Sequence, residues 1–306
     1  MMNRRNALQI LGGFLALQGL SMLASAPKIG VKIGFVPISD HLIIIAKQLC
    51  QSQNFNIVPI KFASWVDLAE ALRAGAIDGA FLLAPLGLML RANKADIKVV
   101  MSAHKNGSSL VARSDISSVR ALAGKKIAVP SKFSMHYFLL DIIARRENID
   151  FITIEMPPPE MPFALLSRQI DAYIVAEPFG QMAVNFKNRA KNLLFSKDIK
   201  PNHICCTLNF RSDLLSEPYF DELLAAFKKA ALFITKEHAA SARLGEAIMN
   251  QKAALLEQIL DENIARYDDL GLNLAELKEL RDFLVAKGLG NENLANLDIS
   301  EYLEAR

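Results

Sequence analysis

Short apolar, β-branched segments alternate with amphipathic segments over the first third of the chain. The pattern predicts four strands, at Val31–Pro37, Asn56–Phe62, Ile77–Leu83 and Ile97–Ser102. Between them it predicts three helices, at Leu42–Leu49, Trp65–Ala74 and Leu86–Ala92. Strands that alternate with helices in this way predict a mostly parallel sheet covered on both faces.

The same alternation resumes after a polar loop, His104–Ser109. The sequence predicts further short strands at Leu110–Arg113, Ile152–Glu155 and Leu193–Phe195, after which Ile204–Asn209 carries the chain onward. It also predicts a helix, a glycine stop and a strand within Val119–Ala128, and a helix at Ser134–Glu147. A second α/β unit is therefore expected after the first.

Two stretches echo one another, Ala71–Gly87 and Glu155–Gly180. Each contains Ile-Asp, then an apolar strand, then Pro-x-Gly, and each aspartate (Asp78, Asp171) precedes its proline by seven positions. Seven extended residues span roughly 23 Å, one buried strand and its exit. The echo predicts two similar lobes, with functional loops where their strands end and with the two aspartates fixing turns.

The pattern becomes helical after residue 214. Apolar residues recur at spacings of three and four in predicted helices at Tyr219–Lys236, Ala239–Asn250, Lys252–Leu260, Leu274–Lys287 and Ile299–Leu303. We expect an α/β fold with a first lobe of residues 27–113 and 205–306, carrying these C-terminal helices, and a second lobe of residues 114–204. Two crossings between lobes predict a hinge and an interlobe cleft.

The first 26 residues are typical of a secretory leader. Arg4 and Arg5 precede an apolar run that ends in Ala24-Ser25-Ala26. The arginine pair resembles a twin-arginine signal, although Ala7 stands where an aromatic residue is usual. Export to the periplasm is therefore predicted, with the general and twin-arginine routes and the exact cleavage position left open. A membrane anchor is the alternative.

Charge and cysteine content exclude several classes of protein. The formal net charge is +3. The sequence contains no basic run interleaved with aromatic residues, so nucleic-acid binding is not expected. Three cysteines are too few for a disulfide framework. If Cys205 and Cys206 lie in a strand, only one can face the cleft. We expect no metal site there, because a metal needs more ligands than the sequence places near the pair, although His203 is close.

Several motifs together resemble a known family of transport proteins. They are GFVPISD (34–40), ASW (63–65), IDGAFLLAPL (77–86), GKKIAVP (124–130), PPPEM (157–161) and IDAYIVAEPF (170–179). In order and spacing they resemble the type II periplasmic substrate-binding proteins of ABC importers, in the nitrate, sulfonate, taurine and bicarbonate class. The nitrate- and bicarbonate-binding branch is the most similar. The resemblance implies a two-lobed fold and a membrane permease as partner.

The resemblance also implies a set of ligand-binding residues. Positions that match that branch are Ser39, Trp65, His136, Pro158 and Glu177. Two positions depart from it. Ser108 stands where a glutamine is usual, and Cys206 stands where the nitrate binders have a lysine. Both departures remove groups suited to a small oxyanion, so nitrate itself is not the expected ligand.

The residues themselves leave alternatives open. Trp65 is either a core aromatic or a cleft wall, and Ser39 either caps a helix or binds ligand. Ser134 and His136 lie at the start of a predicted helix, whose free backbone amides favour binding of a negatively charged group. The alternative for His136 is a structural histidine whose ring nitrogens are hydrogen-bonded within the protein. Glu177 is either a cleft group or a structural carboxylate at a turn.

The sequence thus predicts a monomeric binding protein that closes on a small anionic or zwitterionic solute. No enzymatic activity and no cofactor are expected. One alternative is an enzyme on the same fold, resembling the pyrimidine-precursor synthases or menaquinone-pathway enzymes, which a cytoplasmic location would favour. A second is a periplasmic ligand sensor, which neighbouring genes would distinguish.

Overall fold

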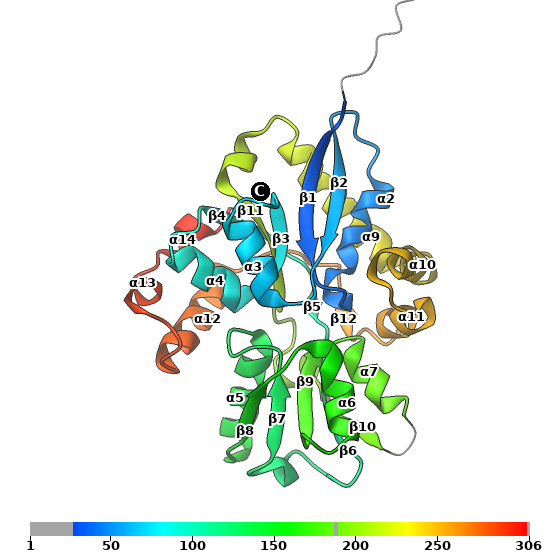
Figure 1. The fold of residues 1–306 in the computed structure, drawn as a ribbon, viewed down its shortest axis with the longest axis vertical. Coiled ribbons are helices and arrows are strands. Elements are labelled where there is room, and N and C mark those ends of the chain that lie inside the picture. Colours follow the sequence, from blue (N-terminus) through cyan, green and yellow to red (C-terminus); the bar gives the residue numbers. More distant parts are fainter. Residues whose placement is uncertain (1–26, 187–188, 305–306) are drawn as a thin grey trace, which may run out of the picture.

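The computed structural model describes residues 27–186 and 189–304. The predicted leader, residues 1–26, lies outside this range. The described chain is a mixed α/β fold with one five-stranded sheet in each half of the molecule (Figure 1). The predicted fold class is confirmed.

The first sheet has the strand order β2-β1-β3-β11-β4. Its strands are β1 (Ile29–Phe35), β2 (Phe55–Lys61), β3 (Gly79–Leu83), β4 (Ile97–Ser102) and β11 (Cys206–Arg211). Strand β1 pairs parallel with β2 and β3, whereas β11 pairs antiparallel with β3 and β4. Strand β11, which comes late in the chain, therefore begins at the end of the sheet where β1, β3 and β4 finish.

The second sheet repeats this plan, with the order β8-β7-β9-β6-β10. Its strands are β6 (Ser108–Arg113), β7 (Lys126–Val129), β8 (Ile152–Glu155), β9 (Ala172–Ala176) and β10 (Ala190–Phe195). Strand β7 pairs parallel with β8 and β9, and β6 pairs antiparallel with β9 and β10. The correspondence of β3 with β9 is the echo that the sequence predicts.

The two echoed aspartates make the same backbone contact. Asp78 Oδ2 accepts from the Lys32 amide at 2.8 Å, and Asp171 Oδ2 accepts from the Lys126 amide at 2.9 Å. Each carboxylate thus ties the start of its strand to the parallel neighbour. Both aspartates therefore have the same structural contact, made with a neighbouring strand rather than within a turn.

Helices flank both sheets (Figure 1). The α-helices are α2 (Ala46–Leu49), α3 (Trp65–Arg73), α4 (Ala84–Ala92), α5 (Met135–Glu147), α6 (Met161–Leu166), α7 (Phe179–Val184), α8 (Ser196–Ile199), α9 (Phe220–Lys236), α10 (His238–Met249), α11 (Ala253–Asp261), α12 (Leu274–Ala286), α13 (Glu292–Ala295) and α14 (Ile299–Tyr302). Short 3-10 helices occupy Ser39–Ile45, Arg120–Leu122, Pro158–Glu160 and Ser212–Ser216. The helix predicted from Leu42 thus begins earlier, as a 3-10 turn, and only a 3-10 turn forms after Val119.

Short strands mark the crossings between the two halves. Strand β5 (Lys105–Asn106) pairs with β12 (Ala265–Arg266), and Lys105 also bridges to Ile204. Strand β6 follows directly and pairs only within the second sheet. Its residues belong to that sheet and not, as predicted, to the end of the first lobe. The chain changes sheet earlier because β6 takes the antiparallel place that β11 takes in the first sheet.

The C-terminal helices pack mainly against the first sheet, but α12 also reaches the second half. Phe283 of α12 packs against Phe138 of α5, with ring centroids 4.7 Å apart and the ring planes tilted by 50°. The Lys200 ammonium lies 2.9 Å from a carboxylate oxygen of Glu279. Helix α12 therefore joins the two halves. Across residues 27–186 and 189–304, the longest apolar helices fall short of a bilayer-spanning length.

Candidate functional site

Four buried side chains converge where the first sheet meets the crossings. They are Asp40, His104, Cys205 and Cys206, and one carboxylate oxygen, one ring nitrogen and the two sulfurs all lie within 4.8 Å of one another. Each of the four residues is essentially inaccessible to solvent. Such a set of donors is chemically suited to a metal ion.

The topology of the first sheet explains why residues so distant in sequence meet. Strand β1 leads to Asp40 and β4 leads to His104, so both residues follow the carboxyl ends of parallel strands. Strand β11 runs the other way and begins at the same edge, where Cys206 pairs with Leu83 at the end of β3. The cysteine pair is thereby brought against the two loops.

The four side chains face one another without satisfying one another. His104 Nε2 lies 3.0 Å from Asp40 Oδ2, and the Cys206 thiol lies 3.9 Å from the same oxygen. Among the described residues, three buried atoms of the cluster lack a hydrogen bond of good geometry. They are Asp40 Oδ1 and the two ring nitrogens of His104. Buried polar atoms are almost always paired in proteins, so unpaired ones indicate a site for something else.

Burial and mutual contact shift the acidities of the cluster. Burial alone lowers the pKa of His104, but the adjacent Asp40 carboxylate outweighs it and raises that pKa to about 10. The neighbouring Cys206 thiol and burial raise the pKa of Cys205, and burial raises the pKa of Cys206. The protein alone therefore holds a histidinium–carboxylate pair beside two neutral thiols.

A glycine gives the cluster its space. A Cβ placed on Gly107 would lie 2.6 Å from Asp40 Oδ1 and 3.0 Å from the His104 ring. Gly107 also has φ +95°, a conformation that other residues rarely adopt. The Tyr267 hydroxyl closes the opposite side by donating a hydrogen bond to the Ser39 carbonyl.

The second sheet meets the first at the residue before Asp40. The Ser39 amide and hydroxyl both donate to the Glu177 carbonyl, at 2.7 and 2.8 Å. The Glu177 amide in turn donates to the Gly107 carbonyl at 2.9 Å. These bonds join the edge of the second sheet to the loops that carry the four-residue cluster.

The Glu177 side chain is satisfied within the second half. It accepts hydrogen bonds from the Ser109 hydroxyl and, at 2.9 Å, from the Gln181 amide. Burial raises the pKa of Glu177 to about 7, against the lowering effect of those two hydrogen bonds. Its geometry is that of a structural carboxylate at a turn.

Three further buried histidines surround the cluster, each with one unpaired ring nitrogen: His41, His136 and His203. His136 Nε2 lies 2.9 Å from the Ser108 hydroxyl, and His203 Nδ1 lies 3.0 Å from the Ile204 carbonyl. Burial lowers the pKa of all three to about 3. They are therefore neutral imidazoles, each able to coordinate a metal ion or to form a hydrogen bond.

The chain matches one family over most of its length, residues 24–248. The chain belongs to the NMT1-like family. Among solved structures this family member is similar to the ligand-binding component of an ABC-type import system from Staphylococcus aureus, solved with zinc bound. The two chains are 26% identical, with a TM-score of 0.81 and coverage of 91% of this chain and 97% of that one.

The periplasmic nitrate-binding protein NrtA of Synechocystis shares the fold of this NMT1-like protein, at 17% identity and a TM-score of 0.78, over 91% of this chain and 87% of that one. A curated relative, the nitrate import ATP-binding protein NrtC of Synechocystis, is 27% identical over 184 residues, 51% of this chain. The match spans only 28% of that relative's length. The resemblance to type II periplasmic binding proteins is thus confirmed.

The structure places some predicted ligand-binding residues of this family member near the cluster. Cys206 is part of it, Ser39 adjoins Asp40, and Ser108 follows Gly107. His136 is held by Ser108. Ser39 is the first residue of its 3-10 helix and bonds Glu177 rather than capping a helix, so the predicted capping role is wrong.

Other predicted residues make contacts of a different kind. Trp65 is buried in the first half with its ring edge-on to His41, at a centroid distance of 5.5 Å, and its indole nitrogen lacks a partner. Ser134 caps α5 by accepting from the Tyr137 amide at 3.2 Å. Pro158 is buried in the 3-10 turn of the triple-proline segment. Their role towards a ligand stays a prediction.

Two sequence arguments about the cysteines are wrong. Cys205 precedes β11, so the alternation of a strand does not apply to it, and both sulfurs belong to the cluster. The argument that too few metal ligands stand near the pair fails because the fold supplies Asp40 and His104 from distant loops. One feature of the sequence could have indicated the cluster. Asp40 and His104 each follow closely after a predicted strand, where ligand-binding loops of such sheets lie.

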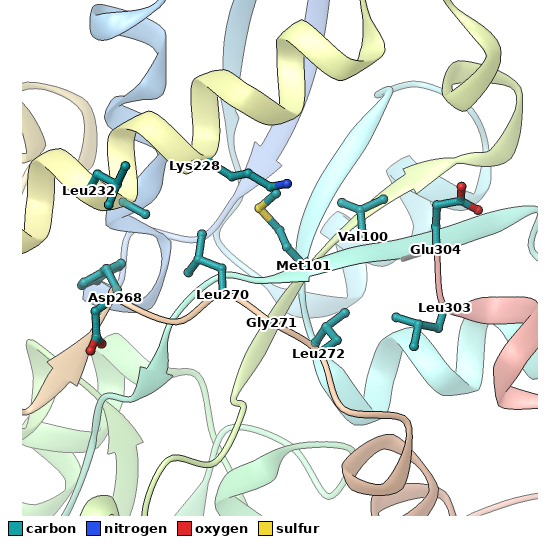
Figure 2. Close-up of a pocket in the computed structure, with 12 residues that line it drawn as sticks. Val100, Met101, Lys228, Leu232, Asp268, Leu270, Gly271, Leu272, Leu303 and Glu304 are labelled. Carbon is teal, nitrogen blue, oxygen red and sulfur yellow. The ribbon is translucent and has the colours of Figure 1, made fainter. Parts of the chain in front are cut away.

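A cavity of about 700 Å³ with a mostly apolar lining lies elsewhere, between β4, α9 and the C-terminal segment. Figure 2 shows side chains that line it, among them Met101, Leu270 and Leu272. None of the predicted ligand-binding residues lines it.

Proposed function

We propose that this protein is the solute-binding component of an ABC import system, acting outside the cytoplasm and delivering its solute to a membrane permease. One observation carries the proposal. Nearly the whole chain, and nearly the whole of the staphylococcal ligand-binding component, superimpose at 26% identity and a TM-score of 0.81. Binding, rather than catalysis, is the activity that this relative's description names.

The arrangement of the two halves supports the proposal. Two sheets of like order are joined by short crossing segments, and the loops at their edges meet at Ser39 and Glu177. Proteins with open parallel α/β sheets bind their ligands at the carboxyl ends of the strands. A hinge movement that separates these edges would open the buried cluster to solvent.

The solute is a cation in this proposal, instead of the anionic or zwitterionic solute predicted from the sequence. Asp40 and the two thiols supply one negative charge and two groups that become negative on coordination. The staphylococcal relative was solved with zinc bound. A small anion would gain nothing from a carboxylate at the centre of its site.

The test of import is a comparison of uptake. Cells that lack the gene, and the same cells complemented with it, are grown in dilute medium, and depletion of metal ions and small solutes from the medium is followed by mass spectrometry. We expect at least one solute to be depleted only by complemented cells. Equal depletion of every solute by both strains would contradict an import function.

A matched measurement addresses binding directly. Because a solute that binds only the folded state stabilises it, 100 times its dissociation constant should raise the free energy of unfolding by about 2.7 kcal/mol. The same solute should decrease the radius of gyration in solution scattering if the two halves close on it.

A further inference from the structure

The four buried donors form a set that one class of ligand satisfies. Two thiolates, one imidazole and one carboxylate are the ligands that zinc takes in proteins, and thiolates in particular select soft or borderline metals over Mg²⁺ and Ca²⁺. Oxygen-preferring ions would leave both sulfurs of Cys205 and Cys206 unused. The donor chemistry therefore narrows the ligand to a thiophilic metal ion.

The spacing of the donors fits one tetrahedral ion. Zinc bonds of about 2.3 Å to sulfur and about 2.0 Å to nitrogen or oxygen give donor–donor edges of roughly 3.3–3.8 Å. Here the His104–Asp40 edge is 3.0 Å and the Cys206–Asp40 edge is 3.9 Å, with all donors within 4.8 Å. Movements of roughly 1 Å or less would bring the set to tetrahedral geometry.

The unpaired atoms point the same way. Asp40 Oδ1 and His104 Nδ1 lack hydrogen-bonding partners among the described residues although both are buried, and His104 Nε2 lies 3.0 Å from Asp40 Oδ2 without good hydrogen-bond geometry. Leaving buried polar groups unpaired is costly unless a ligand satisfies them. The glycine at position 107 also leaves space beside these atoms, because a Cβ there would lie 2.6 Å from Asp40 Oδ1 and 3.0 Å from the His104 ring.

We propose that Asp40, His104, Cys205 and Cys206 form a binding site for a single thiophilic divalent metal ion of the zinc type. We further propose that this ion is the solute that the protein carries, a role that rests on the function proposed above. Asp40 supplies a carboxylate oxygen, His104 supplies Nε2, and the two cysteines bind as thiolates after losing their protons to solvent.

The position of the site links the ion to movement of the two halves. His104 lies directly before crossing strand β5, and Cys205 follows Ile204, which bridges to Lys105 of that strand. Ser39, the neighbour of Asp40, is bonded to Glu177 of the second half. An ion bound to these residues would connect both crossing segments to the loop after β1. Separation of the two halves at the Ser39–Glu177 contact would open the site to solvent.

Metal binding by the purified protein tests the site. The protein is stripped with a chelator under reducing conditions and titrated with Zn²⁺ in competition with a chromophoric chelator, and with Co²⁺ as a spectroscopic substitute. We expect one ion per chain, intense visible bands typical of four-coordinate Co²⁺, and a thiolate-to-cobalt charge-transfer band.

Variants separate a ligand from a structural role. Asp40→Asn, His104→Gln, Cys205→Ser and Cys206→Ser should each lower zinc affinity by at least about 10–100-fold, and each cysteine variant should reduce the charge-transfer band. Matched controls are Cys50→Ser, at a half-buried free thiol, and His238→Gln, at a half-exposed histidine paired with Asp261. The controls should keep affinity within about threefold of the parent.

Several results would overturn the site: no zinc binding by the parent protein, cobalt binding without a charge-transfer band, or equal losses in the ligand and control variants. Circular dichroism shows whether each variant is folded. If one cysteine variant does not fold, the other and the parent's cobalt spectrum still decide the question.

Uptake distinguishes failure of the site from failure of the import function. Under limiting zinc, cells complemented with the parent gene should accumulate zinc, and cells complemented with the Asp40→Asn gene should not. If the parent binds no zinc but restores uptake of another solute, the metal inference is wrong and import stands. If zinc binds through the thiolates and uptake of no solute changes, the import function is wrong and the site stands.

Discussion

The two halves of the molecule are built alike but use their strand edges differently. Each sheet has five strands in the corresponding order, with one strand that enters antiparallel from a crossing. Even the aspartate–arginine pairs correspond, with Asp78 beside Arg211 in the first sheet and Asp171 beside Arg113 in the second. The sheets themselves are therefore alike, and the strand ends differ in the loops that follow them.

At the first edge the buried polar atoms lack partners, whereas at the second edge they are largely paired. Asp40 and His104 leave atoms unsatisfied. Glu177 is satisfied by Ser109 and Gln181. A carboxylate with its own donors is part of the scaffold, and one without them is available to a ligand. Burial does not separate these two acidic side chains, but their hydrogen bonds do.

The largest expected effect follows from exchanging those two carboxylates for amides. Asp40→Asn should lower zinc affinity by about 100-fold or more, because it removes an anionic ligand. Glu177→Gln should change zinc affinity by less than about threefold, because that side chain is bound within the second half. The measurement is competition with a chromophoric chelator. Equal losses in the two variants would erase the distinction between the two edges.

A pair of glycine substitutions probes the same contrast. A Cβ on Gly107 would lie 2.6 Å from Asp40 Oδ1, and one on Gly180 would lie 2.6 Å from Glu177 Oε1. Gly107→Ala should lower the free energy of unfolding by about 2–3 kcal/mol, because φ +95° adds strain to the contact. It should also weaken zinc binding, and Gly180→Ala should only destabilise the fold.

Gly124→Ala is the control for backbone strain in this experiment. Gly124 also has a positive φ, +68°, but nothing lies within 4 Å of its added Cβ. Urea denaturation of the three variants separates strain from contact. If Gly124→Ala cost as much as Gly107→Ala, the close approach to Asp40 would explain nothing.

Glu177 should also give the protein a measurable pH dependence. Burial raises its pKa from 4.5 to about 7, so the folded state holds a proton that the unfolded chain releases. The stability it contributes is present below pH 4.5 and is lost as the pH rises through about 7. Relative to Glu177→Gln, the parent protein should therefore lose about 3 kcal/mol between pH 4.5 and pH 7.5.

Chemical denaturation of the two proteins across this pH range provides the measurement. The difference between them isolates Glu177 from His41, His136 and His203, which act in the opposite sense because their lowered pKa values destabilise the fold in acid. A difference that does not vary with pH would show that Glu177 is ionised in the folded protein.

The smallest effects should be equal in the two halves. Ser64 caps α3 by accepting from the Asp67 amide at 3.1 Å, and Ser134 caps α5 by accepting from the Tyr137 amide at 3.2 Å. Replacing either serine with alanine should lower the free energy of unfolding by about 1 kcal/mol. Thermal denaturation is sufficient to measure this. A zinc affinity lowered by Ser134→Ala alone would give that serine the ligand role that the sequence predicts.

Much of the fold could be predicted because its signals are local. The strand at Ile97–Ser102 and the helix from Trp65 follow from apolar periodicity and a capping serine. The echo of Asp78 and Asp171 gave the repeated lobe plan. Prediction failed at strand β6, since a short strand does not reveal which of two sheets it pairs with.

The candidate site was harder to predict, because its members are individually ordinary. In the sequence, Asp40 is the last residue of the GFVPISD motif, His104 is part of a polar loop, and Cys205 is one of two adjacent cysteines. Each has a common structural role, so none stands out alone. The argument that only one cysteine can face the cleft required both to lie in a strand, and Cys205 lies outside β11, so that argument does not apply.

By itself, the sequence determined the alternation of strands and helices, the doubled lobe, the echoed aspartates and the family resemblance, all of which depend on residues close together in the chain. Only the tertiary structure decided which polar groups are left without partners. That property depends on antiparallel entry of β11 at the edge where β1 and β4 end, which brings Cys205 and Cys206 to Asp40 and His104. Pairing of distant loops is a result of topology, and no local pattern encodes it.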